Sequence, residues 1–281
     1  MNTQSVFKKS KVKSGLFQVF CLAVGLVLCL PLVYAVLISF MQETEIVSRD
    51  LHLIPKHWSM ANYEAVIESQ NLLRYMFNSL VVAMISSFSR VIIGCLAAYS
   101  FAFFEYRGKH VLFALVVGSM IIPPEMLMVQ NYFTTAELGL INTYIGMTII
   151  FMVSAANIFL IRQHYLSTSR SVWEAAKVDG CSNWRFFVGI LMPISKPVIA
   201  TVFISSFVTS WNSYLWPLMV TNVDSMRTVQ VVITKLNASE LNTVYGQVMA
   251  AAVLILIPSA IVFVLFQRKI TAGMMAGAVK E

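Results

Sequence analysis

Three groups of side chains in this chain of 281 residues have types and spacings that suggest a function. The segment WEAAKVDG, residues 173–180, places an acid and two alanines shortly before a glycine. Arg90 is the one charge that lies well inside a long apolar run. Trp211, Asn212 and Tyr214 lie inside another such run, and aromatic faces beside amide and hydroxyl groups are typical of sugar-binding surfaces. The first group predicts a contact with another body, and the other two are candidates for a solute path.

Patterns that mark an enzyme are missing from the sequence. No Ser-His-Asp set, no paired acids within an apolar run and no H-E-x-x-H occur, and no acid stands at a ligand position near His52 and His57. There is also no G-x-x-x-x-G-K-[ST] loop for nucleotide phosphates. The four cysteines form no C-x-x-C and are interpreted as small apolar side chains. We therefore expect no catalytic site and no metal site. Any process driven by ATP would need a nucleotide-binding site on another chain.

The composition indicates which elements must position these candidates. Hydrophobic residues make up 58% of the chain and charged residues 12%, whereas average soluble domains carry about a quarter charged residues. Apolar runs that cross a bilayer must be helical, because backbone polar groups cannot stay unpaired in hydrocarbon. We predict an all-α polytopic membrane protein, with one transmembrane domain over 1–281 and six helices. The expected spans are approximately 16–41, 75–103, 111–129, 138–161, 197–223 and 241–267.

The first run is too long for a signal peptide, whose apolar core has about 7–15 residues. We expect an uncleaved helix instead. In the outer loop that follows, a short amphipathic helix is predicted around Met60 to Ile67.

The distribution of Lys and Arg predicts the orientation of the helices. With the N-terminus inside and six crossings, the inner segments are 1–15, 104–110, 162–196 and 268–281. They carry 14 of the 20 basic residues, whereas the outer segments carry five. Cytoplasmic loops of membrane proteins hold the excess of Lys and Arg, so both termini are expected inside. The same rule explains the net charge of +7 without a nucleic-acid partner.

The largest inner loop, 162–196, reads as two short helices. Ser171 and Glu174 have the spacing of a capping box, which predicts a helix that starts there. Gly180 is placed to end this helix in a left-handed conformation. A second helix is expected to start near Ser182 and to stop before Pro193. The residues alone leave open whether this pair lies on lipid headgroups or seats another protein.

A resemblance favours the second alternative. The loop is similar to the "EAA" loop of permease subunits of binding-protein-dependent ABC importers, whose pattern is EAA, three residues, G, nine residues and I-x-L-P. The matching residues are Glu174, Ala175, Ala176, Asp179, Gly180, Ile190, Met192 and Pro193, with methionine in place of the usual leucine. Nearly the whole chain resembles the smaller permease of the carbohydrate-type branch. The further stretches are NSL (78–80), LINTYIGMTI (140–149), WNSYLWPL (211–218) and AGAVK (276–280).

The resemblance implies a function and a set of partners. It implies a multi-pass subunit of a bacterial inner membrane that forms half of the path for a sugar, an oligosaccharide or a glycerol-phosphate-type solute. The implied partners are a second permease, two ATPase subunits that bind ATP and Mg²⁺, an extracytoplasmic solute-binding protein, and membrane lipid. Within the loop, it implies that Glu174 contacts the ATPase and that Gly180 sets the angle of the two helices. Ile190, Met192 and Pro193 would anchor the second helix.

Alternatives remain open for the residues of the membrane part. Arg90 either packs against protein with a bonded carbonyl or faces the solute. Asn78, Ser79, Trp211, Asn212 and Tyr214 either line the path or join helices by hydrogen bonds. The rival function is an ion-coupled secondary transporter, which requires acids or broken-helix ion sites in the membrane. The apolar runs offer no acid at depth.

Overall fold

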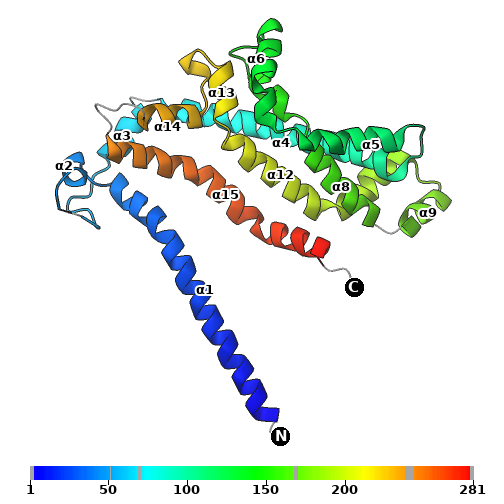
Figure 1. The fold of residues 1–281 in the computed structure, drawn as a ribbon, viewed down its shortest axis with the longest axis horizontal. Coiled ribbons are helices and arrows are strands. Elements are labelled where there is room, and N and C mark those ends of the chain that lie inside the picture. Colours follow the sequence, from blue (N-terminus) through cyan, green and yellow to red (C-terminus); the bar gives the residue numbers. More distant parts are fainter. Residues whose placement is uncertain (1–2, 51, 69–70, 168–169, 238–243, 279–281) are drawn as a thin grey trace. The chain divides into compact units, whose positions relative to one another are not determined.

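The computed structural model describes residues 3–50, 52–68, 71–167, 170–237 and 244–278 (Figure 1). These residues form helices, turns and loops, with no β-strand in the described ranges, and the chain is all-α as predicted. They group into two compact units, residues 1–70 with 237–254 and residues 71–236 with 255–281. The start of the expected sixth span, 241–243, and the end of AGAVK, 279–280, lie outside the described residues.

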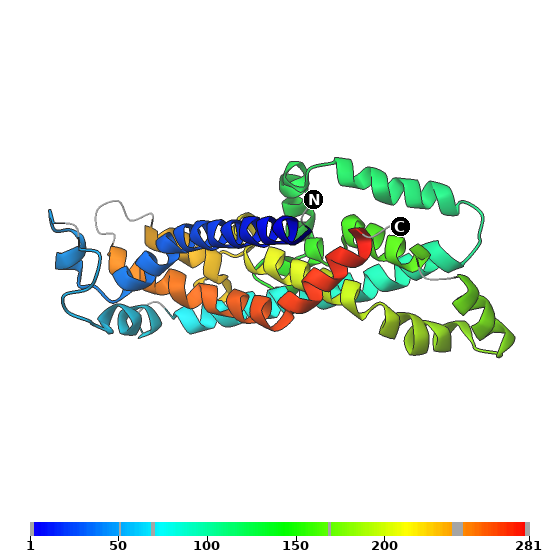
Figure 2. The same cartoon turned by 90° about the horizontal axis from the view of Figure 1, so that it is seen from below.

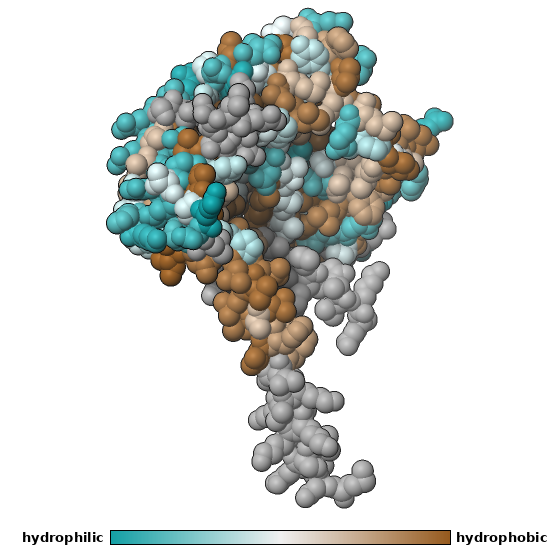
Figure 3. All heavy atoms as spheres, turned by 60° about the vertical axis from the view of Figure 1, so that its left-hand side comes forward, coloured by the Kyte–Doolittle hydropathy of each residue, from teal (hydrophilic) through white to brown (hydrophobic). Residues whose placement is uncertain are grey.

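The first unit is a long apolar helix with a polar cap at its end. Its elements are α1 (Thr3–Ser39), α2 (Glu43–Ile46), α3 (Ala61–Glu68) and the first part of α15 (Tyr245–Ala278). From Phe17 onward, most side chains of α1 are exposed and apolar, and Figure 3 shows this helix as a brown surface. Such a surface suits contact with lipid rather than water. Helix α3 confirms the short helix expected around Met60 to Ile67.

Side-chain hydrogen bonds hold the cap of the first unit together. The amide of Asn62 on α3 donates to the carbonyl oxygen of Met41 at 2.8 Å. The carboxylate of Glu43 accepts from the backbone N–H groups of Tyr245 and Gly246, each at 3.4 Å. These N–H groups have no partner within their own helix, and the carboxylate also suits the positive end of the helix dipole. The acid therefore caps α15.

The second unit is built around α4 (Leu72–Phe103), which is unbroken over 32 residues. Helices α8 and α12 pack along it (Figure 1). Gly94 of α4 allows the close approach, since an added Cβ would lie 3.1 Å from Cδ1 of Ile161. The other helices before the inner loop are α5 (Lys109–Gly118), α6 (Met128–Glu137), α7 (Tyr144–Thr148) and α8 (Ala155–Ser167). The inner loop contains α9 (Arg170–Val178). The helices that follow it are α10 (Asn183–Phe186), α11 (Met192–Ile194), α12 (Lys196–Trp211), α13 (Leu215–Val220) and α14 (Val229–Asn237).

Several apolar runs are broken rather than continuous helices. Within the described residues, three helices are individually long and apolar enough to cross a membrane: Phe17–Ser39, Leu72–Phe103 and Tyr245–Leu265. Three bent helix pairs would raise the count to six. They are Lys109–Ile121 with Pro124–Glu137 at 92°, Tyr144–Phe151 with Ala155–Ser167 at 50°, and Asn183–Ile194 with Lys196–Trp211 at 77°. Figure 2 shows the first break, where the chain leaves α5 and turns into α6.

The break in the first pair follows from proline chemistry. Pro123 and Pro124 lack a backbone N–H, and proline disfavours helical backbone angles in the residue before it. The 3₁₀ turn 119–121 therefore ends the first helix, and Pro124 opens the next turn, where no N–H is required. Pro217 likewise lies in the first turn of α13. The break between α12 and α13 falls at residues 212–214, inside the run 197–223 that the sequence presents as continuous.

Candidate functional site

The inner loop begins with α9, which carries the EAA residues. Helix α9 begins at Arg170, within one residue of the predicted start, but Ser171 lies inside the helix and is not its N-cap. The other end follows the prediction, since Gly180 has a φ of +73°. The N–H of Cys181 bonds the carbonyl of Ala176 at 2.9 Å, and the N–H of Gly180 bonds that of Lys177 at 3.1 Å. This pair of bonds is the Schellman motif, in which the residue after the helix takes a left-handed conformation.

The second limb of the loop starts as expected and ends differently. The hydroxyl of Ser182 accepts from the backbone N–H of Arg185 at 3.3 Å and caps α10. The chain then widens into a π-helix, Phe187–Leu191, and continues through α11, so the prediction that the helix stops before Pro193 is wrong. In a regular α-helix, the proline ring would collide with the carbonyl four residues earlier. The wider π turn precedes Pro193, which then lies in the first residues of α11.

One face of the loop is buried against the membrane helices. Ala176, Phe186 and Leu191 join a core cluster with residues of α4, α8 and α12. Ile190 and Met192 pack against this cluster, while Pro193 is exposed. The loop is therefore seated on the bundle as a body with its own core.

The two limbs also hold each other. The ring of Trp173 on α9 meets that of Phe186 edge-on, with centroids 4.6 Å apart. The ammonium of Lys177 lies 4.6 Å from the Trp173 ring centroid and also contacts the side-chain oxygen of Asn183. A cation over an aromatic face adds an attraction beyond simple packing.

The opposite face of α9 is exposed. Glu174, Ala175 and Asp179 are accessible, and Val178 retains 88% of its surface. These four residues form a small exposed surface with two acids and one large apolar side chain. Figures 1 and 2 place α9 beyond the end of the bundle at which α4 finishes.

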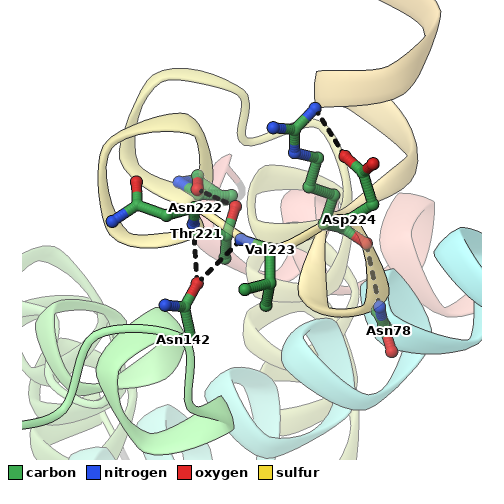
Figure 4. A network of polar contacts seen from close by, with 8 residues as sticks. Asn78, Asn142, Thr221, Asn222, Val223 and Asp224 are labelled. Carbon is green, nitrogen blue, oxygen red and sulfur yellow. Dashed lines mark hydrogen bonds and ion pairs between the residues drawn. The ribbon is translucent and has the colours of Figure 1, made fainter.

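At the other end of α4, the stretches NSL (78–80) and LINTYIGMTI (140–149) meet the segment 221–229 in a polar network, here called the outer clasp (Figure 4). Its members are Asn78, Ser79, Asn142, Tyr144 and the segment 221–229. Asn78 donates to the carbonyls of Ser225 at 3.0 Å and Arg227 at 2.9 Å, and it accepts from the hydroxyl of Tyr144 at 2.7 Å.

Asn142 and Ser79 complete the clasp. The side-chain oxygen of Asn142 accepts from the N–H groups of Asn222 and Val223 at 2.6 and 3.1 Å (Figure 4). The hydroxyl of Ser79 accepts from the N–H of Val229 at 2.9 Å. Asn78 and Ser79, which the sequence nominates for the solute path, thus place their polar atoms on the backbone of the clasp.

Arg90 bonds a carbonyl at a break in the fourth apolar run. Its Nε donates to the carbonyl oxygen of Phe151 at 2.5 Å, and the guanidinium carbon lies 5.5 Å from the Phe151 ring centroid. Phe151 ends the 3₁₀ turn 149–151, after which the chain bends before α8. A helix that ends leaves its last carbonyl oxygens without N–H donors of its own. The charged guanidinium of Arg90 is the donor to this one.

The aromatic group of the fifth run divides at the end of α12. Trp211 is 1% exposed and stacks on Phe207 with centroids 5.9 Å apart. Asn212 and Tyr214 are exposed in the break before α13, and the side-chain oxygen of Asn212 accepts from Gln230 at 3.3 Å. Among the six candidates for the solute path, Asn212 and Tyr214 have accessible polar groups. Within the described residues, these groups do not bond the backbone of the outer clasp or of a helix break.

Two residues that make close contacts between segments were not predicted from the sequence. Gly146 lies so close to Leu140 that an added Cβ would be 2.1 Å from the Leu140 carbonyl oxygen. The carbonyl of Gly146 accepts from the Trp216 indole at 3.1 Å. Tyr99 bonds the inner loop across 84 residues of sequence. A glycine within LINTYIGMTI gives a weak signal, whereas a tyrosine in an apolar helix gives none.

A bundle of long and broken apolar helices with a loop packed on one end has the architecture of a multi-pass membrane protein. Residues 76–275 match the family described as binding-protein-dependent transport system inner membrane component, and the chain belongs to this family. It is therefore an inner-membrane component that works with a solute-binding protein and is not itself a catalytic subunit.

Similar proteins cover nearly the same length. An sn-glycerol-3-phosphate transport system permease protein of Brucella melitensis is 32% identical over 258 residues, 89% of this chain and 92% of its own. An arabinooligosaccharides transport system permease protein of Bacillus subtilis is 29% identical over 268 residues, 94% of this chain and 90% of its own. A chain of a bacterial ABC transporter involved in the import of alginate is 22% identical with a TM-score of 0.80, over 95% of this chain and 98% of that one.

Replacing Gly146 by alanine should destabilise the second unit by about 1–3 kcal/mol, because the new methyl group would overlap a backbone carbonyl and force a shift. The apparent melting temperature of the purified protein in detergent measures this effect. Gly118→Ala is the matched control, since an added Cβ there meets nothing within 4 Å. Equal melting temperatures for the two variants would contradict the prediction.

Replacing Arg90 by methionine should also lower the melting temperature, because the carbonyl of Phe151 loses its donor at a cost of about 1–3 kcal/mol. Ser89→Ala is the control, since that hydroxyl only bonds a carbonyl of its own helix, that of Ile85. A variant at Arg90 with normal stability and altered solute preference would instead assign Arg90 to the path.

Proposed function

We propose that this chain forms half of the translocation path of an ATP-driven importer for a polyhydroxylated solute: a sugar, an oligosaccharide or a glycerol-phosphate compound. Support comes from the relatives, whose names give glycerol 3-phosphate and arabinose oligosaccharides as transported compounds. A second permease would complete the path, and two ATPase subunits would bind ATP and Mg²⁺, with no cofactor on this chain.

The proposal includes six spans with both termini in the cytoplasm and one transmembrane domain over the whole chain. Three long helices and three bent pairs together allow six crossings. The excess of Lys and Arg in the segments assigned to the inside supports this orientation. The family match from 76 to 275 crosses both compact units, which supports a single domain.

The observation that carries the proposal is the division of α9 into two faces. Ala176 is buried on the bundle, whereas Glu174, Ala175 and Asp179 remain accessible beside the exposed Val178. We assign this accessible face to the ATPase, with Glu174 in a polar contact or salt bridge and Ala175 allowing close approach. The left-handed Gly180 would set the angle between the limbs, and Ile190, Met192 and Pro193 would keep the second limb in place.

For the solute path, accessibility favours Asn212 and Tyr214 over the other candidates. Amide and phenol groups are suited to hydroxylated solutes, since each offers both hydrogen-bond donors and acceptors. The hydrogen bonds of Asn78, Ser79 and Arg90, and the burial of Trp211, favour supporting roles for these four.

Charge reversal at Glu174 tests the coupling assignment. The tagged chain would be purified in mild detergent from cells that express the complete system, and co-purified subunits would be quantified by mass spectrometry. We expect a second permease and about two copies of an ATPase with the wild type. Glu174→Lys should reduce the ATPase at least tenfold while the second permease remains.

Two controls separate this effect from misfolding. Glu137→Lys reverses an exposed charge on α6, away from the inner loop. Gly189→Ala adds a methyl group to the same loop in open space, whereas Gly180→Ala forces alanine into a left-handed conformation. Purification of the wild-type chain alone or as a homodimer, or retention of the ATPase by Glu174→Lys, would contradict the proposal.

A separate measurement identifies the solute class: the uptake of glycerol 3-phosphate and of arabinose oligosaccharides by the reconstituted wild-type complex.

A further inference from the structure

Tyr99, near the end of α4, is the centre of the contact between this helix and the inner loop. It is 7% exposed. Its ring lies 5.0–6.4 Å, between centroids, from five aromatic rings, those of Phe103, Phe104, Trp173, Phe186 and Phe187. Its hydroxyl donates to the carbonyl oxygen of Asn183 at 3.0 Å. Packing between these rings is compatible with many orientations of the loop. The hydrogen bond between Tyr99 and Asn183 is directional and therefore fixes one of them.

Asn183 connects both limbs of the loop to this bond. It is the first residue of α10, and its carbonyl also accepts the N–H of Phe187 within the second limb. Its side-chain oxygen contacts the ammonium of Lys177, which belongs to α9 and lies over the ring of Trp173. Lys177 thus connects α9 to Asn183, and Tyr99 connects Asn183 to α4.

Helix α4 is suited to carry such a displacement across the membrane. It is unbroken over 32 residues, whereas its neighbours α5, α8 and α12 each belong to a bent pair. At about 1.5 Å per residue, Tyr99 and Asn78 lie about 30 Å apart along the axis, which is the thickness of the hydrocarbon core. At the far end, Arg74 and Asn78 both donate to the carbonyl of Ser225 at 3.0 Å.

We propose that Tyr99 is a positioning residue for transport, whose hydrogen bond to Asn183 transmits movement of the inner loop through α4 to the outer clasp. The inference rests on the proposed function, because it takes the ATPase as the source of movement. Tyr99 contacts neither solute nor ATP in this role. It acts by keeping the inner loop and α4 in one fixed orientation during the cycle.

Tyr99→Phe tests the role, because it removes the hydroxyl and keeps the ring. We expect normal assembly with the ATPase, an unchanged melting temperature within about 2 °C, and continued ATP hydrolysis. The solute transported per ATP in proteoliposomes should fall about three- to tenfold, as expected for the loss of one hydrogen bond. The probe is glycerol 3-phosphate or an arabinose oligosaccharide, whichever the wild type transports.

Tyr106→Phe is the matched control. Tyr106 lies close by in sequence, and its hydroxyl accepts from Ser100 at 3.3 Å, with no hydrogen bond to the inner loop among the described residues. This variant should transport like the wild type. A parallel loss of stability, assembly and hydrolysis in Tyr99→Phe, with an unchanged ratio of solute to ATP, would assign Tyr99 a structural role only and overturn the inference.

A second measurement needs no solute. A fluorophore on Ser225→Cys, in a chain whose four native cysteines are alanine, reports on the outer clasp of the purified complex. Trapping with ATP and vanadate should change the signal in the wild-type background, and Tyr99→Phe should reduce this change at least threefold. Equal changes in both backgrounds would overturn the inference alone. A wild-type chain that carries no ATPase would overturn the proposed function and this inference with it.

Discussion

The structure depends on one constraint: backbone polar groups inside a membrane must find partners within the protein. A continuous helix meets this constraint by itself, and a broken one does not. The second unit contains broken helices, and side chains of the unbroken α4 supply the missing partners. Arg90 bonds the carbonyl at one break, and Asn78 and Ser79 bond the segment between α13 and α14. The unbroken helix thus stabilises the broken ones.

The inner loop meets the same constraint at the water side by different means. Gly180 lets the last carbonyls of α9 bond the following N–H groups, and Ser182 caps the next helix with its hydroxyl. Both devices satisfy backbone groups with partners inside the loop itself. Its buried face packs on the bundle, and its other face stays accessible.

How far the sequence predicts this arrangement depends on whether a local signal exists. Long apolar runs predict α1, α4 and α15, because their length and composition leave few alternatives. The left-handed Gly180 was also predictable, since glycine at the end of a helix has a known conformational cause. Pro123 and Pro124 indicate a helix end by their missing donors. The family was predictable too, because the spacing of the EAA residues is long and specific.

Other features have a weak local signal or none. The break at 152–154 contains no proline or glycine, and the local signal is Ser154, whose hydroxyl accepts from the N–H of Asn157 at 3.3 Å at the start of α8. The bond from Arg90, 61 residues away, to the carbonyl of Phe151 has no local signal. The π-helix before Pro193 is a geometric response to a proline that reads as a stop. The roles of Asn78 and Ser79 were ambiguous, since the same groups suit a solute or a backbone. Tyr99 was invisible, because nothing in its own segment distinguishes a packing tyrosine from a bonding one.

The contacts of α4 with other segments share one physical feature. Five of its side chains, those of Arg74, Asn78, Ser79, Arg90 and Tyr99, bond backbone atoms of other segments. A bond to a backbone carbonyl or N–H does not depend on the side chain at that position. Residues 225–229, Phe151 and Asn183 are therefore held by α4 through their backbone atoms, whatever their own side chains do. The bond to its backbone leaves the side chain of Asn183 available for its contact with Lys177.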